Sequence, residues 1–89
     1  MRVEKSSHTV FTPLDDGTGV LLNVDTLFYY SLNRTGVALW KLIEANTSFT
    51  PDDLVPANCE RFEVDREAAR RGIVAFVERL EELKILRVA

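Results

Sequence analysis

The sequence has little of what metal centres, disulfide scaffolds and membrane spans require. Cys59 is its one cysteine and His8 its one histidine. A single cysteine cannot form an intrachain disulfide, which favours a reducing, cytoplasmic setting. Zinc sites are built mainly from cysteine and histidine, so we expect no metal site. We also expect no cofactor. Residues 1–7 lack the apolar core of a signal peptide, and no apolar run approaches the roughly 20 residues of a membrane span, so we expect no membrane partner.

Length and charge narrow the classes of protein to which the chain could belong. The 89 residues are 46% hydrophobic and 28% charged, which is typical of one soluble globular domain covering residues 1–89. We expect residues 1–8 to be flexible. The formal net charge of -3 provides no overall attraction for a phosphate backbone, so nucleic acid is not an expected partner.

The first third of the chain has the composition of strands. β-Branched and apolar residues fill 9–14, and residues 15–19 form a turn, because Asp-Gly readily supplies positive φ angles. Residues 20–24 form a short apolar strand, 25–26 a second tight turn, and 27–32 an aromatic strand. The pattern predicts a three-stranded antiparallel meander.

The two faces of the third predicted strand differ in their surroundings. Side chains alternate along a strand, and Leu32 adjoins the next helix, so its set is predicted to point inward. The inward set is Phe28, Tyr30 and Leu32. The outward set is Leu27, Tyr29 and Ser31. The outward set is more apolar than an idle surface requires, although single exposed apolar residues are common.

Two helices are predicted in the middle of the chain. Asn33 is a good N-cap for a helix to about Ala45, with Trp40 as its central anchor. Gly36 is unfavourable inside this helix, which suggests that something packs closely against it. The second helix starts at Thr50-Pro51, because proline is favoured at the first helical position.

Pro56 interrupts this second helix. A proline there removes a backbone donor and clashes with the preceding turn, so we expect a short, kinked or divided element ending near Arg61. We expect Cys59 and Phe62 to supply its buried contacts.

The last helix has the clearest periodicity, from its cap at Asp65 to about Lys84. Spacings of three and four predict a core-facing stripe of Ala69, Ile73, Phe76, Val77, Leu80 and Leu83. One flank of this stripe carries Arg66, Arg70, Val74, Val77 and Glu81. The other flank carries Ala68, Ala75, Arg79 and Glu82. Residues 85–88 are predicted to lie back on the core as an apolar tail.

Several of these segments together carry a family resemblance. They are Val20–Thr26, Tyr29–Asn33, Thr35-Gly36, Leu39-Trp40, Thr50–Leu54 and Leu83–Leu86. In this combination the chain resembles PqqD-like proteins, also called RiPP recognition elements, over nearly all residues after Val10. Leu27 departs from the pattern because it stands where the family usually places a turn glycine, and Pro56 stands in a helix that is usually continuous.

The resemblance implies an α+β, winged-helix-like fold, in which a three-stranded antiparallel sheet is followed by three helices. It also implies a non-catalytic function: the domain binds the leader of a ribosomally made precursor peptide and presents it to a modifying enzyme, such as a radical SAM protein or a peptidase. The leader would add a strand beside the third strand, in a groove closed by the third helix. The residues predicted to bind it are Leu27, Tyr29, Ser31, Arg66, Arg70, Ile73, Val74 and Val77. Of these, the two arginines are suited to pair with acids of the leader.

Three other interpretations stay open. A homodimer would pair the same strand edge with its own copy. A winged helix can bind DNA, here through Arg66, Arg70 and Arg71, but the glutamates of the same helix oppose phosphate contacts. An enzyme would need a nucleophile beside a base, and neither His8 nor Cys59 has an evident partner.

Overall fold

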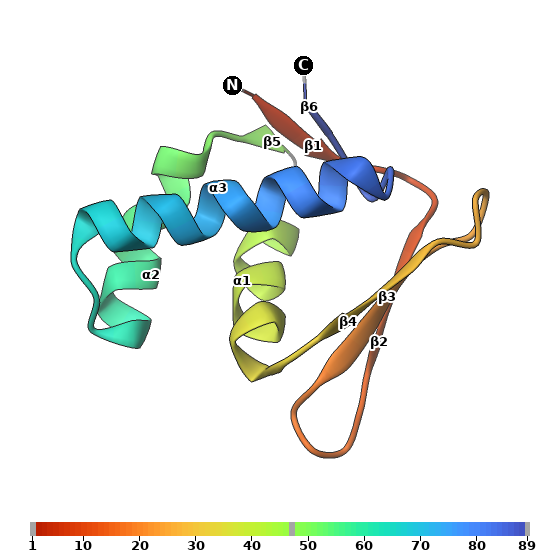
Figure 1. The fold of residues 1–89 in the computed structure, drawn as a ribbon, viewed down its shortest axis with the longest axis horizontal. Coiled ribbons are helices and arrows are strands. Elements are labelled where there is room, and N and C mark those ends of the chain that lie inside the picture. The colour runs from red at the N-terminus through yellow and green to blue at the C-terminus, as the bar shows by residue number, and fades with distance from the viewer. Residues whose placement is uncertain (1, 47, 89) are drawn as a thin grey trace.

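A computed structural model of the chain describes residues 2–46 and 48–88 (Figure 1). Its elements, in chain order, are β1 (Val3–Lys5), β2 (Thr9–Pro13), β3 (Gly19–Asn23), β4 (Tyr29–Leu32), α1 (Arg34–Glu44), β5 (Ser48–Phe49), the 3₁₀ helix η1 (Pro51–Leu54), α2 (Val55–Phe62), α3 (Arg66–Glu82) and β6 (Leu86–Val88). The helix α3 lies across the molecule, with α2 near its first turns and the β2–β4 sheet beyond its last turns (Figure 1).

The predicted meander is confirmed. Its strand order is β2-β3-β4, both pairs are antiparallel, and Leu21 pairs with Phe11 on one side and Tyr30 on the other. The third strand begins two residues later than predicted, because Leu27 has a positive φ of 62° and belongs to the turn. Its N–H donates to the carbonyl of Asn23 at 2.8 Å, which closes that turn.

A second small sheet, of order β5-β1-β6, was not predicted. It joins the two ends of the chain, as Val3 pairs with Phe49 and with Val88 (Figure 1). Val3 is fully buried, so residues 3–5 differ from the flexible terminus that we expected for residues 1–8; residue 1 lies outside the described residues. The prediction that the last apolar residues lie on the core is confirmed, because Ile85 and Leu86 are buried.

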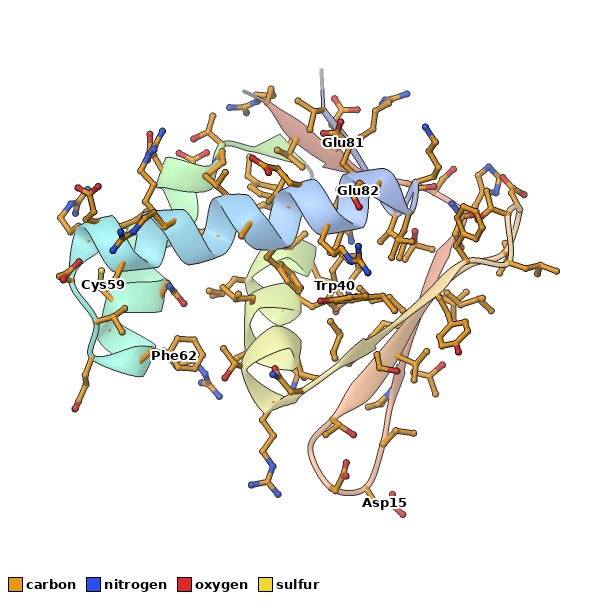
Figure 2. The ribbon with its side chains drawn as sticks, in the orientation of Figure 1. Asp15, Trp40, Cys59, Phe62, Glu81 and Glu82 are labelled. Carbon is orange, nitrogen blue, oxygen red and sulfur yellow. The ribbon has the colours of Figure 1, made fainter. Side chains whose placement is uncertain are left out.

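The helix α1 follows the prediction closely. The side chain of Asn33 accepts the N–H of Gly36 at 2.8 Å, as an N-cap does. Trp40 is buried and projects from α1 toward the β2–β4 sheet (Figure 2). A Cβ on Gly36 would lie 3.1 Å from a methyl of Leu32, so close packing accounts for this glycine.

Pro56 divides the next segment as predicted, into η1 and α2. The carboxylate of Asp53 accepts the N–H of Thr50 at 2.8 Å, and this hydrogen bond lowers the pKa of Asp53. The buried contacts differ in part from the prediction. Leu54 and Val55 are buried. Cys59 is half-buried but packs against the core as predicted, whereas Phe62 is half-buried and is not among the residues that pack against it. Figure 2 labels both side chains on α2. The junction between η1 and α2 therefore supplies the fully buried apolar contacts of this segment.

The helix α3 begins as predicted, with the carboxylate of Asp65 accepting the N–H of Ala68 at 2.7 Å. Its buried stripe is Ala69, Ile73, Val77 and Leu80. Phe76 and Leu83, which we expected in this stripe, are half-buried and pack against the core at its margin. The helix ends at Glu82, two residues early, because Lys84 adopts a left-handed φ of 61°. Glu81 and Glu82 mark this end in Figure 2.

None of the helices that the structure describes is long and apolar enough to cross a membrane.

Candidate functional site

The strand β4 is an edge of its sheet, and two of its residues direct their backbone groups to the open side. The N–H of Asn23 donates to the carbonyl of Phe28 at 2.9 Å, and bonded and non-bonded pairs alternate along an antiparallel ladder. The pairs of Tyr30 with Leu21 and of Leu32 with Gly19 are therefore the bonded ones. The backbone N–H and C=O groups of Tyr29 and Ser31 point away from β3. This edge can accept another strand.

A hollow of about 450 Å³ lies between this edge and α3; we call it the β4–α3 hollow. Its lining residues are Tyr30, Ser31 and Leu32 of β4, Asn33, Thr35, Gly36 and Leu39 at the start of α1, and Gly72, Ala75, Phe76 and Arg79 of α3. Among them, Arg79 alone carries a charge. An extended peptide on the strand edge would have apolar side-chain space beside it.

Aromatic and cationic groups form the wall of the hollow nearest the sheet. The rings of Tyr30 and Phe76 meet edge to face, with 6.5 Å between their centroids. The guanidinium of Arg79 lies 5.9 Å from the centroid of Tyr30 and 3.3 Å from a carboxylate oxygen of Glu82. Both members of this ion pair are more than half exposed, so the pair is weak and Arg79 stays available to another carboxylate.

The strand residues among the predicted site lie at or near this edge. Tyr29 and Leu27 are 67% and 71% exposed, on the outer side and in the turn, and Ser31 lines the β4–α3 hollow. The predicted division of faces holds for Tyr30 and Leu32, which lie inward, while Phe28 is half exposed.

The predicted helix residues are placed differently. Ile73 and Val77 are buried in the core and present no surface to a peptide. Arg70 forms an ion pair with Asp52 of η1 at 2.9 Å, so its flank of α3 faces η1. Val74 is half-buried and Arg66 exposed, and neither lines the β4–α3 hollow. The structure therefore does not bring the predicted flank to the strand edge.

The opposite flank faces β4 instead. The helical periodicity puts Ala75 and Arg79 on that flank, but we predicted no binding role for them, and we did not predict Gly72 or Phe76 as surface residues. The periodicity marks the core stripe of a helix and leaves its two flanks equivalent. A small residue on a solvent-facing turn, such as Gly72, was the available indication that one flank borders a hollow.

The outer face of the sheet forms a second surface. Val10, Leu22 and Tyr29 are direct cross-strand neighbours on it, followed by Thr12, Val20 and Ser31. None of these side chains is charged, and Val10 and Tyr29 are 48% and 67% exposed. This face meets the open edge at Tyr29 and Ser31.

Groups suited to metal or nucleophilic chemistry are scattered. The described residues contain no cluster of three or more His, Cys, Asp and Glu side chains that could hold a metal ion. His8 pairs with Asp25 at 3.5 Å, and Cys59 is half-buried on α2.

The chain is thus a winged-helix-like α+β domain with an open strand edge beside a hollow, and such an edge is able to accept an added strand. The chain belongs to the PqqD family, because the family model for coenzyme PQQ synthesis protein D matches residues 18–86. This confirms the resemblance noted in the sequence.

Two solved structures share the fold over almost the whole chain. TbiB1 in complex with the TbiA(beta) leader peptide is 28% identical, with a TM-score of 0.84 over 97% of this chain and 96% of that one. Lasso peptide synthetase B1 complexed with the leader peptide is 25% identical, with a TM-score of 0.76 over 97% of this chain and 98% of that one. No curated protein matches the chain in sequence.

Proposed function

We propose that this chain binds the leader segment of a ribosomally made precursor peptide as a fourth strand along β4. The observation that carries the proposal is the open backbone of Tyr29 and Ser31 directly beside the β4–α3 hollow. The similar structures of TbiB1 and lasso peptide synthetase B1 both hold leader peptides, which supports the same ligand class here.

Backbone pairing alone is too weak for this function. Tyr29 and Ser31 each offer one N–H and one C=O, and each added hydrogen bond contributes about 1 kcal/mol net. Association itself costs about 4 to 15 kcal/mol. Two or three buried leader side chains, at about 1.5 to 3 kcal/mol each, are needed to bring the affinity toward the micromolar range.

The β4–α3 hollow is where we place these anchors. Ala75, Phe76 and Tyr30 offer apolar contact, and their hollow is large enough for more than one side chain. Arg79 is suited to hold an acidic residue of the leader, since its present partner Glu82 is exposed. The specificity of binding then comes from side chains, because strand addition itself accepts almost any sequence.

Presentation to a modifying enzyme requires a second surface, and we assign it to the outer face of the β2–β4 sheet. A leader strand on β4 would extend this uncharged face, so that an enzyme docked there contacts both the domain and its bound peptide. Val10→Lys should leave the leader affinity within about twofold but weaken binding of the enzyme by tenfold or more, because a charge buried against an apolar surface is costly. Equal enzyme binding by both proteins would rule out this face.

We propose that the chain is itself non-catalytic and acts in the cytoplasm, where a ribosomal peptide first becomes available. In support, the residues that line the β4–α3 hollow include no histidine, cysteine or carboxylate.

The decisive experiment alters the edge without altering the core. Ser31→Pro removes an N–H that points away from β3, and edge strands tolerate proline at such positions. We expect its leader affinity, measured by calorimetry, to fall at least tenfold, because the ring also obstructs the added strand. Ser31→Ala keeps the N–H and should bind like the original protein. Equal binding by both variants would exclude strand addition at β4.

The original protein and Ser31→Pro also distinguish leader binding from the homodimer and DNA-binding interpretations. Backbone amide shifts on adding leader peptide should be confined to residues 29–33 and to the β4-facing side of α3. A lack of shifts, together with a mass that rises with protein concentration and is lowered by Ser31→Pro, would establish the homodimer instead. Shifts caused by duplex DNA alone would favour the nucleic-acid interpretation.

A further inference from the structure

Gly72 occupies the middle of α3, where glycine is a poor choice. The helix runs without interruption from Arg66 to Glu82, and glycine is less favourable than alanine at an interior helical position. A glycine at this position calls for an explanation, either in the packing of the chain or in contact with a bound partner.

The other three glycines have reasons within the chain. Gly17 adopts a φ of 90°, which other residues rarely adopt. A Cβ on Gly19 would lie 2.6 Å from the ring of Phe11, and one on Gly36 would lie 3.1 Å from Leu32. Gly72 has no such reason. Its φ is not positive, and a Cβ added there would meet, apart from its chain neighbours and the adjoining helix backbone, no described atom within 4 Å.

Gly72 does lie where a bound peptide would need open space. It lines the β4–α3 hollow, together with Ala75 and Phe76, which are its neighbours on the same helical face. Any side chain on Gly72 would project into this hollow and take space from an occupant. The bare helix backbone thus forms part of the hollow's floor.

The α3 side of the hollow around Gly72 is apolar. Arg79, the charged residue of the lining, stands seven positions further along α3, which is about 10 Å along the helix axis. The side chains within one turn of Gly72 that line the hollow are those of Ala75 and Phe76. Ser31, Asn33 and Thr35 add uncharged polar groups to the lining, but the helix surface around Gly72 itself offers only apolar contact. A large apolar side chain of an occupant would therefore be well accommodated against this surface, whereas a carboxylate there would be far from Arg79.

We propose that Gly72 is a specificity-determining residue, whose missing side chain makes room for one bulky apolar residue of the bound peptide. The inference rests on the proposed function and deepens it, because it assigns a side-chain class to one position of the leader. The glycine makes α3 of the free domain less stable than alanine would, and it leaves that space open.

The test compares Gly72→Ala with Arg71→Ala, an exposed neighbour that does not line the hollow. Gly72→Ala should raise the midpoint of thermal unfolding by roughly 4 °C, because alanine favours the helix. It should lower the affinity for a synthetic leader peptide by about tenfold, since the added methyl overpacks the occupied site. Gly72→Leu should lower the affinity by about a hundredfold. Arg71→Ala should leave the affinity within twofold.

An alanine scan of the leader identifies the occupant. At one bulky apolar position, replacement by alanine should weaken binding to the original protein yet abolish the difference between that protein and Gly72→Ala. A Gly72→Ala variant that binds the leader as tightly as the original protein would overturn the inference and leave leader binding intact. A lower unfolding midpoint would also overturn it, since the glycine would then serve the fold. If the original protein fails to bind any leader, the proposed function itself is lost.

Discussion

The two flanks of α3 begin from the same helical pattern but face different neighbours. One flank carries Arg70, whose guanidinium meets the carboxylate of Asp52 in η1 at 2.9 Å. The other carries Phe76, whose ring meets Tyr30 of β4 and lines a hollow. The first flank therefore meets another element of the same chain, whereas the second lies beside backbone groups of β4 that pair with no strand among the described residues. A helix face becomes a recognition surface through what stands opposite it.

The largest expected contrast between the flanks is in leader affinity. Phe76→Ala removes an apolar wall of the β4–α3 hollow and should weaken binding by about thirtyfold, as expected for the loss of roughly 2 kcal/mol of apolar contact. Val74→Ala, a half-buried truncation on the opposite flank, should leave the affinity within about twofold. Calorimetric titration of both variants with one leader peptide measures the contrast directly.

Arg70→Ala adds a charged control to this comparison. Its ion pair with Asp52 is well exposed on both sides, so its loss should change the free energy of unfolding by less than about 0.5 kcal/mol. If Arg70→Ala or Val74→Ala lost as much leader affinity as Phe76→Ala, the leader would bind at the flank that the sequence pattern first indicated.

Much of the fold was predictable because its signals are local. The Asp-Gly turn, the Asn33 and Asp65 caps and the break at Pro56 depend on a few neighbouring residues, and each has the expected place in the structure. The sheet β5-β1-β6 was missed for the opposite reason. Its strands are two or three residues long and come from distant parts of the chain, so no period-two pattern can develop.

The candidate site was predictable on the strand side and not on the helix side. Alternation along a strand indicates which of two faces is buried, and Leu32 distinguished them. A helix has a buried stripe with two flanks, and the angle at which it crosses its neighbours decides which flank meets β4. That angle is a property of the packed core around Ile73 and Val77, which no local pattern encodes.

A smaller effect is expected on the strand side, at the turn that leads into β4. Leu27 holds a φ of 62°, which costs a non-glycine residue about 1 kcal/mol or more, and its side chain is 71% exposed. Leu27→Gly should therefore raise the free energy of unfolding by roughly 1 kcal/mol, reduced somewhat by the greater freedom of glycine in the unfolded chain. Leu27→Ala keeps the unfavourable φ and should show no such gain. Urea unfolding of the two variants separates backbone strain from loss of the side chain.

The same pair of variants defines how far the recognition surface extends beyond the β4–α3 hollow. Leu27 does not line that hollow, so both variants should bind the leader within about twofold of the original protein. If both lose affinity equally while only Leu27→Gly gains stability, the exposed leucine is itself an anchor. The peptide would then run along the strand edge past Tyr29 into the turn, and the strand side of the site would be longer than the helix flank facing it.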